Sequence, residues 1–64
     1  MTNLYDYFGR DVSIIDVDGK KWCGNVTAYT SAIDSETGAE EIAVRTSDGL
    51  IGFCLSDIEI IEER

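Results

Sequence analysis

Apolar and polar residues alternate along most of this chain, and turn-forming residues interrupt the alternation at short intervals. The run 10–17 places Val12 and Ile14 on one face, and the run 20–30 alternates in the same way. A period of two residues is typical of β-strands that bury one face. Further runs of this kind span residues 41–46, 50–55 and 58–61. The pattern therefore predicts five short strands.

Two Asp-Gly dipeptides separate neighbouring strands, Asp18-Gly19 after the first and Asp48-Gly49 after the third. We expect Asp18-Gly19 to form a two-residue type I′ turn, because Asp and Gly tolerate the positive φ that this turn needs. Gly24, a small residue inside the second strand, is expected to mark a bend or a bulge. The prediction is a strongly bent antiparallel sheet that closes into a small barrel and so hides its edges.

The residues before the first strand predict a short helix over about 2–8. Thr2 can cap its start, Leu4 and Phe8 fall on one face at i and i+4, and Gly9 suits the left-handed position after its end. A helix this short is unstable alone. We therefore expect it to pack across an open end of the barrel, with its aromatic side chains as a plug.

The length of the chain limits its core. Residues 1–64 are expected to form one domain, with the barrel over about 10–61, and a chain of this size buries only ~60% of its unfolded surface. Small domains usually add disulfides, a metal or association. The sequence has no His and two Cys, which disfavours a zinc site. We therefore expect no cofactor, and association between copies as the additional source of stability.

Cys23 and Cys54 lie in separate apolar segments. We interpret them as reduced thiols that pack as small hydrophobic side chains, and a disulfide between them stays open as an alternative. No apolar run approaches the ~20 residues that cross a bilayer, and the first residues lack the layout of a signal peptide. These features predict a cytoplasmic protein without membrane contact.

Acidic residues outnumber basic ones by thirteen to five, which gives a formal net charge of −8. This balance disfavours RNA and DNA, because nucleic-acid binding draws its affinity from Lys and Arg that neutralise phosphates. A basic protein partner fits the charge better. The chain also lacks His, a Gly-rich phosphate loop and a Ser or Cys beside a plausible base. We therefore expect a binding or structural protein and not an enzyme.

The first half of the chain reads Gly9-Arg10-Asp11-Val12, then Asp18-Gly19-Lys20, then Trp22-Cys23-Gly24-Asn25-Val26. This order resembles the first motif of Sm-like (LSM domain) proteins, in which a helix, a glycine and a strand precede an Asp-Gly turn and an aromatic-x-Gly-x-apolar strand. The resemblance spans roughly residues 4–61 and is greatest to the short, acidic, single-domain members of bacteria and phages. It implies a bent, five-stranded, SH3-type barrel behind an N-terminal helix.

The resemblance also implies a homo-oligomeric ring that acts as a structural or protein-interaction module. In such rings the fourth strand of one copy pairs with the fifth strand of the next, which satisfies the exposed edges through head-to-tail assembly. Four residues of these strands are then expected at the interface between copies: Leu50, Phe53, Ile58 and Ile60.

Two alternative functions remain, one from RNA-binding members of the same family and one from a resemblance to SH3 domains. RNA-binding Sm-like proteins build a base pocket at positions that correspond to Tyr29 and Asp34, but Thr30 and Asp34 stand where the family has Asp and Asn, and residues 53–57 lack the family's Arg-Gly. The lost cation weakens the expected attraction for phosphate. The run Leu4-Tyr5-Asp6-Tyr7 resembles the opening of SH3 domains, which bind proline-rich peptides, although this chain has a single Trp and no Pro.

Overall fold

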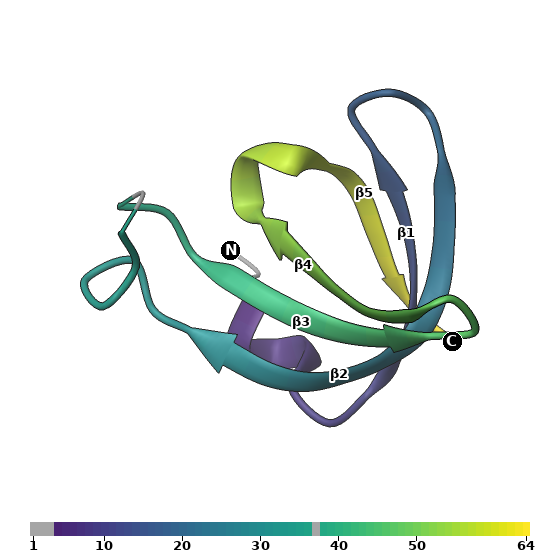
Figure 1. Cartoon of the computed structure of the whole chain (residues 1–64), viewed down its shortest axis with the longest axis horizontal. Helices are drawn as coiled ribbons and strands as arrows, with labels where there is room; N and C mark the ends of the chain where they lie inside the picture. Colours follow the sequence, from purple (N-terminus) through teal and green to yellow (C-terminus); the bar gives the residue numbers. More distant parts are fainter. Residues whose placement is uncertain (1–3, 37) are drawn as a thin grey trace.

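The computed structural model describes residues 4–36 and 38–64. It is mainly β, as predicted, with one antiparallel sheet in the order β4-β3-β2-β1-β5 (Figure 1). The strands are β1 (Asp11–Asp16), β2 (Lys21–Thr30), β3 (Glu41–Thr46), β4 (Gly49–Cys54) and β5 (Ile58–Glu63). All five lie where the alternation predicts them, within two residues at each end. β4 and β5 are the outer strands and no ladder joins them in the described residues, so closure of the barrel stays a prediction.

The sheet curls around a small apolar core. Its buried side chains, none more than 4% exposed, are Leu4, Val12, Ile14, Val26, Ile42, Val44 and Phe53. Val12 and Ile14, which the alternation places on one face of the first strand, are among them. β5 adds Ile58 and Ile61 at the margin of this cluster. The core is therefore built mainly by four strands, β1 to β4, and by Leu4.

Gly24 lies on β2 close against the backbone of β3. A Cβ atom at this position would stand 2.1 Å from the carbonyl oxygen of Arg45 and 2.9 Å from Cγ1 of Val44. Real Cβ atoms do not approach other atoms this closely, so only glycine fits the strand here. The sequence predicts a bend or a bulge at this glycine; the register is regular at Gly24, and the irregularity of β2 lies between Val26 and Ala28.

A bulge in β2 lies at Thr27, between Val26 and Ala28. The extra residue reverses the faces of the strand beyond it. Ala28 is exposed and Tyr29 packs against the core. A strand that alternates without interruption would place Ala28 on the same face as Val26, and Tyr29 on the opposite face. That expectation is wrong for the C-terminal end of β2.

The predicted type I′ turn between β1 and β2 is also wrong. Among the described residues only glycines have positive φ, including Gly19 at 84°. The N–H of Gly19 donates to the carbonyl of Asp16 (2.9 Å), and the N–H of Asp16 donates to the carbonyl of Lys20 (3.0 Å). These bonds define a three-residue loop, a type I turn followed by a left-handed glycine. Val17 belongs to this loop and not to the strand.

A single 3-10 turn, η1 (Leu4–Tyr7), stands where a helix over residues 2–8 is predicted. The predicted cap at Thr2 lies outside the described residues. Leu4 is buried and Phe8 is half exposed, so these two side chains do not share a face. The tighter winding of a 3-10 turn explains the difference, since it aligns i with i+3 instead of i+4.

A second 3-10 turn, η2 (Leu55–Asp57), connects β4 to β5. In Figure 1 this corner carries the chain from one outer strand of the sheet to the other. No helix in the described part of the chain is long and apolar enough to cross a membrane.

Candidate functional site

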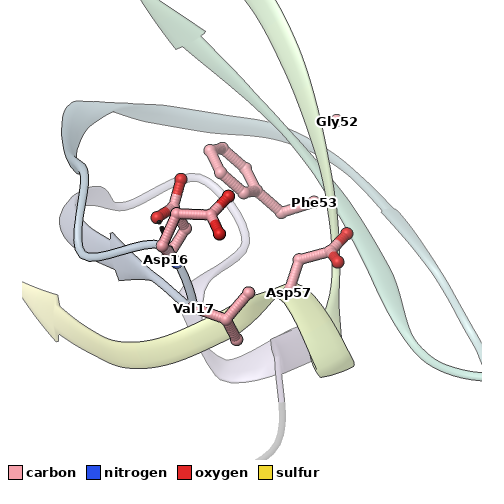
Figure 2. Close-up of a pocket in the computed structure, with 6 residues that line it drawn as sticks. Asp16, Val17, Gly52, Phe53 and Asp57 are labelled. Atoms are coloured by element: carbon pink, nitrogen blue, oxygen red, sulfur yellow. Dashed lines mark hydrogen bonds between the residues drawn. The ribbon is translucent and has the colours of Figure 1, made fainter.

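A hollow opens between the β1–β2 turn, β4 and η2, on the unpaired side of β4 (Figure 2). Six residues line it: Asp16, Val17, Asp18, Gly52, Phe53 and Asp57. Its volume is about 200 Å³, below the ~300–1,000 Å³ of typical small-molecule sites. The N–H of Val17 donates to the carbonyl of Asp57 (3.1 Å) and ties two of its walls together. The hollow is sized for a single side chain.

Asp16 is a fixed carboxylate of the hollow. Its Oδ1 accepts hydrogen bonds from the backbone N–H groups of Asp18 (3.0 Å) and Lys20 (2.9 Å). Its Oδ2 accepts one from the indole N–H of Trp22 (3.0 Å). These bonds, the indole bond above all, hold the pKa of Asp16 below its ordinary value of 3.8. The carboxylate is therefore charged at neutral pH and shapes the turn that carries Asp18.

Asp57 provides a second carboxylate from the opposite side. Its Oδ2 accepts a hydrogen bond from the N–H of Cys54 (3.3 Å), which closes η2. In Figure 2 the two residues flank the hollow on opposite sides, Asp16 at the end of β1 and Asp57 on η2. No group of three or more metal-ligating side chains in the described residues has the geometry to hold a metal ion.

An aromatic wall closes the inner side of the hollow. The ring of Phe53 meets Trp22 edge to face, with 5.8 Å between centroids. The ammonium of Lys20 lies 4.2 Å from the centroid of the Trp22 ring. Trp22 is half-buried and packs against the core. The hollow thus combines an apolar floor with negative walls.

Backbone groups of β4 point away from the sheet beside the hollow. Bonded and non-bonded residue pairs alternate along an antiparallel ladder. The N–H of Leu55 donates to the carbonyl of Glu40 (2.8 Å), so the pair of Ala43 and Gly52, three steps along the same register, is non-bonded. The N–H and C=O of Gly52 therefore point to the open edge, and those of Leu50 do so by the same alternation.

The outer edge of β5 follows the same rule. The N–H of Arg64 donates to the carbonyl of Asp11 (2.7 Å), which makes the pair of Ile14 and Ile61, three steps along, non-bonded. The backbone of Ile61 therefore points to the open edge of β5. The hydroxyl of Tyr7 donates to the Ile61 carbonyl at 3.5 Å, the long limit of such a bond.

The predicted RNA-site residues occupy different environments. The hydroxyl of Tyr29 donates to the carboxylate of Glu40, and its ring meets Tyr5 edge to face at 5.2 Å. Asp34 lies in the β2–β3 loop, where its carboxylate accepts a hydrogen bond from the hydroxyl of Ser31 (3.2 Å). These contacts do not bring the two residues together as one pocket.

Glu40 forms hydrogen bonds to three parts of the fold that are far apart in the sequence. Its carboxylate accepts from Tyr29 and from the N–H of Leu4 (3.5 Å), and its carbonyl accepts from Leu55. The hydrogen bond from Tyr29 to Glu40, with partial burial and the charge of Glu40, raises the pKa of Tyr29 to about 12. The sequence gives no sign of this role for Glu40, because nothing local marks a contact with residue 4.

We expect Tyr29 to ionise well above the ordinary value of 10.0. A pKa that is raised in the folded state adds stability that is fully present below pH 10.0 and is lost as the pH rises through about 12. An absorbance titration of phenolate formation should show one late step among the three tyrosines. Glu40→Gln should move that step back toward 10.0, and Tyr29→Phe should remove it. A late step that persists in Glu40→Gln would contradict the assigned cause.

The residues predicted for the interface between copies differ in their accessibility. Leu50 and Ile60 are 65% and 45% exposed, whereas Ile58 is half-buried. Phe53 is 4% exposed, so its ring belongs to the core of its own chain and only its backbone lies on the edge strand. The two cysteines, Cys23 on β2 and Cys54 on β4, are half-buried thiols.

Comparisons with protein-family models, curated proteins and solved structures give no match to this chain. The class that the fold defines is a small protein built on one five-stranded antiparallel sheet. What the protein does must therefore be inferred from the open strand edges and the acidic hollow.

Proposed function

We propose that this chain is a non-catalytic, Sm-like protein whose sheet closes into a barrel and whose copies assemble into a homo-oligomeric ring. Such a ring would serve as a structural or protein-interaction module. The observation that supports this most is that β4 and β5, the strands that the resemblance pairs between copies, are the two outer strands of the sheet. An open edge is a template for strand pairing, and a repeated head-to-tail contact closes a ring when its rotation permits.

Exposed apolar side chains on both edges favour the same assembly. Leu50 on β4 and Ile60 on β5 are largely exposed, and full burial of a side chain of this kind is worth about 1.5–3 kcal/mol. The net charge of −8 opposes it, because like charges on neighbouring copies repel. Since salt screens this repulsion, we expect assembly to strengthen as the ionic strength rises.

Size-exclusion chromatography with light scattering tests the ring. At micromolar concentration the mass should be a fixed multiple of the chain mass, and dilution at moderate salt should leave that multiple unchanged. A closed ring predicts this plateau, whereas an open chain of copies would grow with concentration. A single-chain mass at tens of micromolar and moderate salt would rule out the proposal.

Single-stranded RNA and proline-rich peptides are weaker candidates. The Tyr29 hydroxyl is engaged by Glu40, and the hydroxyl of Tyr7 contacts the backbone of β5, so neither side chain is presented whole to a ligand. A fluorescence titration with oligo-U and oligo-A at low salt, where phosphate contacts are strongest, would expose any RNA binding.

A further inference from the structure

We propose that the hollow and the adjoining edge of β4 form a docking site for an extended segment of a basic protein, with one lysine or arginine side chain seated in the hollow. This inference rests on the proposed ring in one respect. The segment would use the β4 edge that the next copy uses, so its binding would open the ring. The basic segment therefore regulates assembly as well as attaching a partner.

The backbone of β4 supports an extended occupant. The N–H and C=O of Gly52 point outward beside the hollow, as the ladder alternation requires. An added strand gains affinity from such main-chain groups, and pockets for alternate side chains then give it specificity. Gly52 also has no heavy atom within 4 Å of where a Cβ would be, so the face of β4 beside the hollow is open at this point.

The hollow supports a cationic side chain. Three aspartates, Asp16, Asp18 and Asp57, are among its lining residues, and no lysine or arginine is. Lys20, on the Trp22 ring, offsets part of the charge of Asp16. Phe53 and the exposed Val17 supply apolar surface, against which the aliphatic stem of lysine or arginine can pack while its charged end stays near the carboxylates. The volume of about 200 Å³ suits one such side chain, and the absence of metal-site geometry in the described residues favours an organic cation.

The negative charge of β5 disfavours binding of another copy's β5 at the hollow. β5 carries Glu59, Glu62 and Glu63, all exposed. A neighbouring β5 would bring these carboxylates toward those of the hollow, where like charges repel. The positive charge of a basic segment on the same edge would instead be attracted to these carboxylates. The hollow therefore favours the partner over another copy of the chain, which is how a repulsive element creates specificity.

A labelled peptide of alternating threonine and valine with one central lysine is a direct probe. Its binding to the full chain is followed by fluorescence anisotropy at low salt, and light scattering on the same samples reports the mass of the assembly. We expect saturable binding, at least about tenfold tighter than for the same peptide with glutamate in place of lysine. As the lysine peptide saturates, the mass should fall toward that of a single chain.

Two chain variants locate the site. Asp18→Asn combined with Asp57→Asn should weaken lysine-peptide binding about five- to tenfold, as expected for the loss of two partly exposed ion pairs. Asparagine can still accept the hydrogen bond from Cys54, so η2 should persist. Asp48→Asn removes one charge from the other Asp-Gly turn, which is outside the hollow, and should leave binding nearly unchanged.

Several results would overturn the inference. Equal binding of the lysine and glutamate peptides would show that the hollow does not recognise the lysine side chain. An equal effect of Asp48→Asn and the double variant would show the same. Peptide saturation without a change in mass, in a protein that starts as a ring, would place the peptide away from the β4 edge. If the protein is a single chain throughout these low-salt samples, the ring is decided by light scattering at moderate salt, and the lysine preference and its loss in the double variant still decide whether the docking site exists.

Discussion

Replacing Gly24 by alanine is expected to lower the free energy of unfolding by about 3 kcal/mol or more. The added Cβ would stand 2.1 Å from the carbonyl oxygen of Arg45, and a backbone oxygen cannot move aside as a flexible side chain can. β2 and β3 would have to separate around Val44, a buried core residue. Since a chain of this size has about 3–10 kcal/mol of stability in total, the variant should lose from about a third to all of it.

Urea denaturation followed by tryptophan fluorescence measures this loss, because Trp22 lies on the same strand. Gly52→Ala is the matched control, as it adds the same methyl group to another strand glycine where nothing lies within 4 Å. We expect the control to unfold within about 1 kcal/mol of the natural chain. Similar midpoints for Gly24→Ala and the natural chain would show that the two strands are further apart than the structure places them.

Leu50→Lys should convert the proposed ring into single chains at micromolar concentration. Leu50 is 65% exposed on the outer edge of β4, so the substitution removes little from the core. It replaces apolar surface that pairing would bury with a charge that pairing would desolvate, the means by which natural edge strands avoid association. A loss of about 2 kcal/mol at each junction weakens every contact about thirtyfold, and a ring has such a junction for every copy.

Light scattering on Leu50→Lys, at the concentration and salt where the natural chain gives its plateau mass, provides the measurement. Ile33→Lys is the matched control, since Ile33 is 95% exposed in the β2–β3 loop and not on an outer strand. It carries the same change in charge and apolar area, and should keep the plateau mass. A plateau that survives in Leu50→Lys, or is lost equally in both variants, would exclude the β4 edge from the assembly.

The strands were predictable from sequence because their signal is local and repeated. Val12 and Ile14, like Ile42 and Val44, alternate with residues of lower burial, and each pair is buried in the structure. These predictions needed no knowledge of what lies across the sheet. Gly24, in contrast, was predicted to mark a bend or a bulge, whereas the structure shows a close approach to Arg45 on β3 and places the bulge at Thr27.

The predictions that failed depended on interactions that the local pattern does not contain. The bulge at Thr27 reverses the faces of Ala28 and Tyr29. No glycine or proline at this position signals the bulge in the sequence. The Asp18-Gly19 turn takes a three-residue form because the carboxylate of Asp16 accepts from the N–H groups of Asp18 and Lys20. Propensity for a type I′ turn could not include that competing side chain.

The candidate site was the least predictable part of the molecule. Asp16 and Asp57 are 41 positions apart in the sequence and come together only because the turn after β1 meets η2, through the bond between Val17 and Asp57. Composition alone indicated a basic partner. It could not indicate where on the surface the acidic groups gather, because that depends on the way the outer strands are joined.

The open strand edges also determine how the protein can be kept in solution. Each copy exposes main-chain donors and acceptors on β4 and β5, and the repulsion between acidic copies is what limits indiscriminate pairing among them. That protection fades near the isoelectric point of about 4.1, where the carboxylates take up protons. The acidity of this chain therefore protects its open strand edges from aggregation, and purification or crystallisation in buffers near pH 4 would remove that protection.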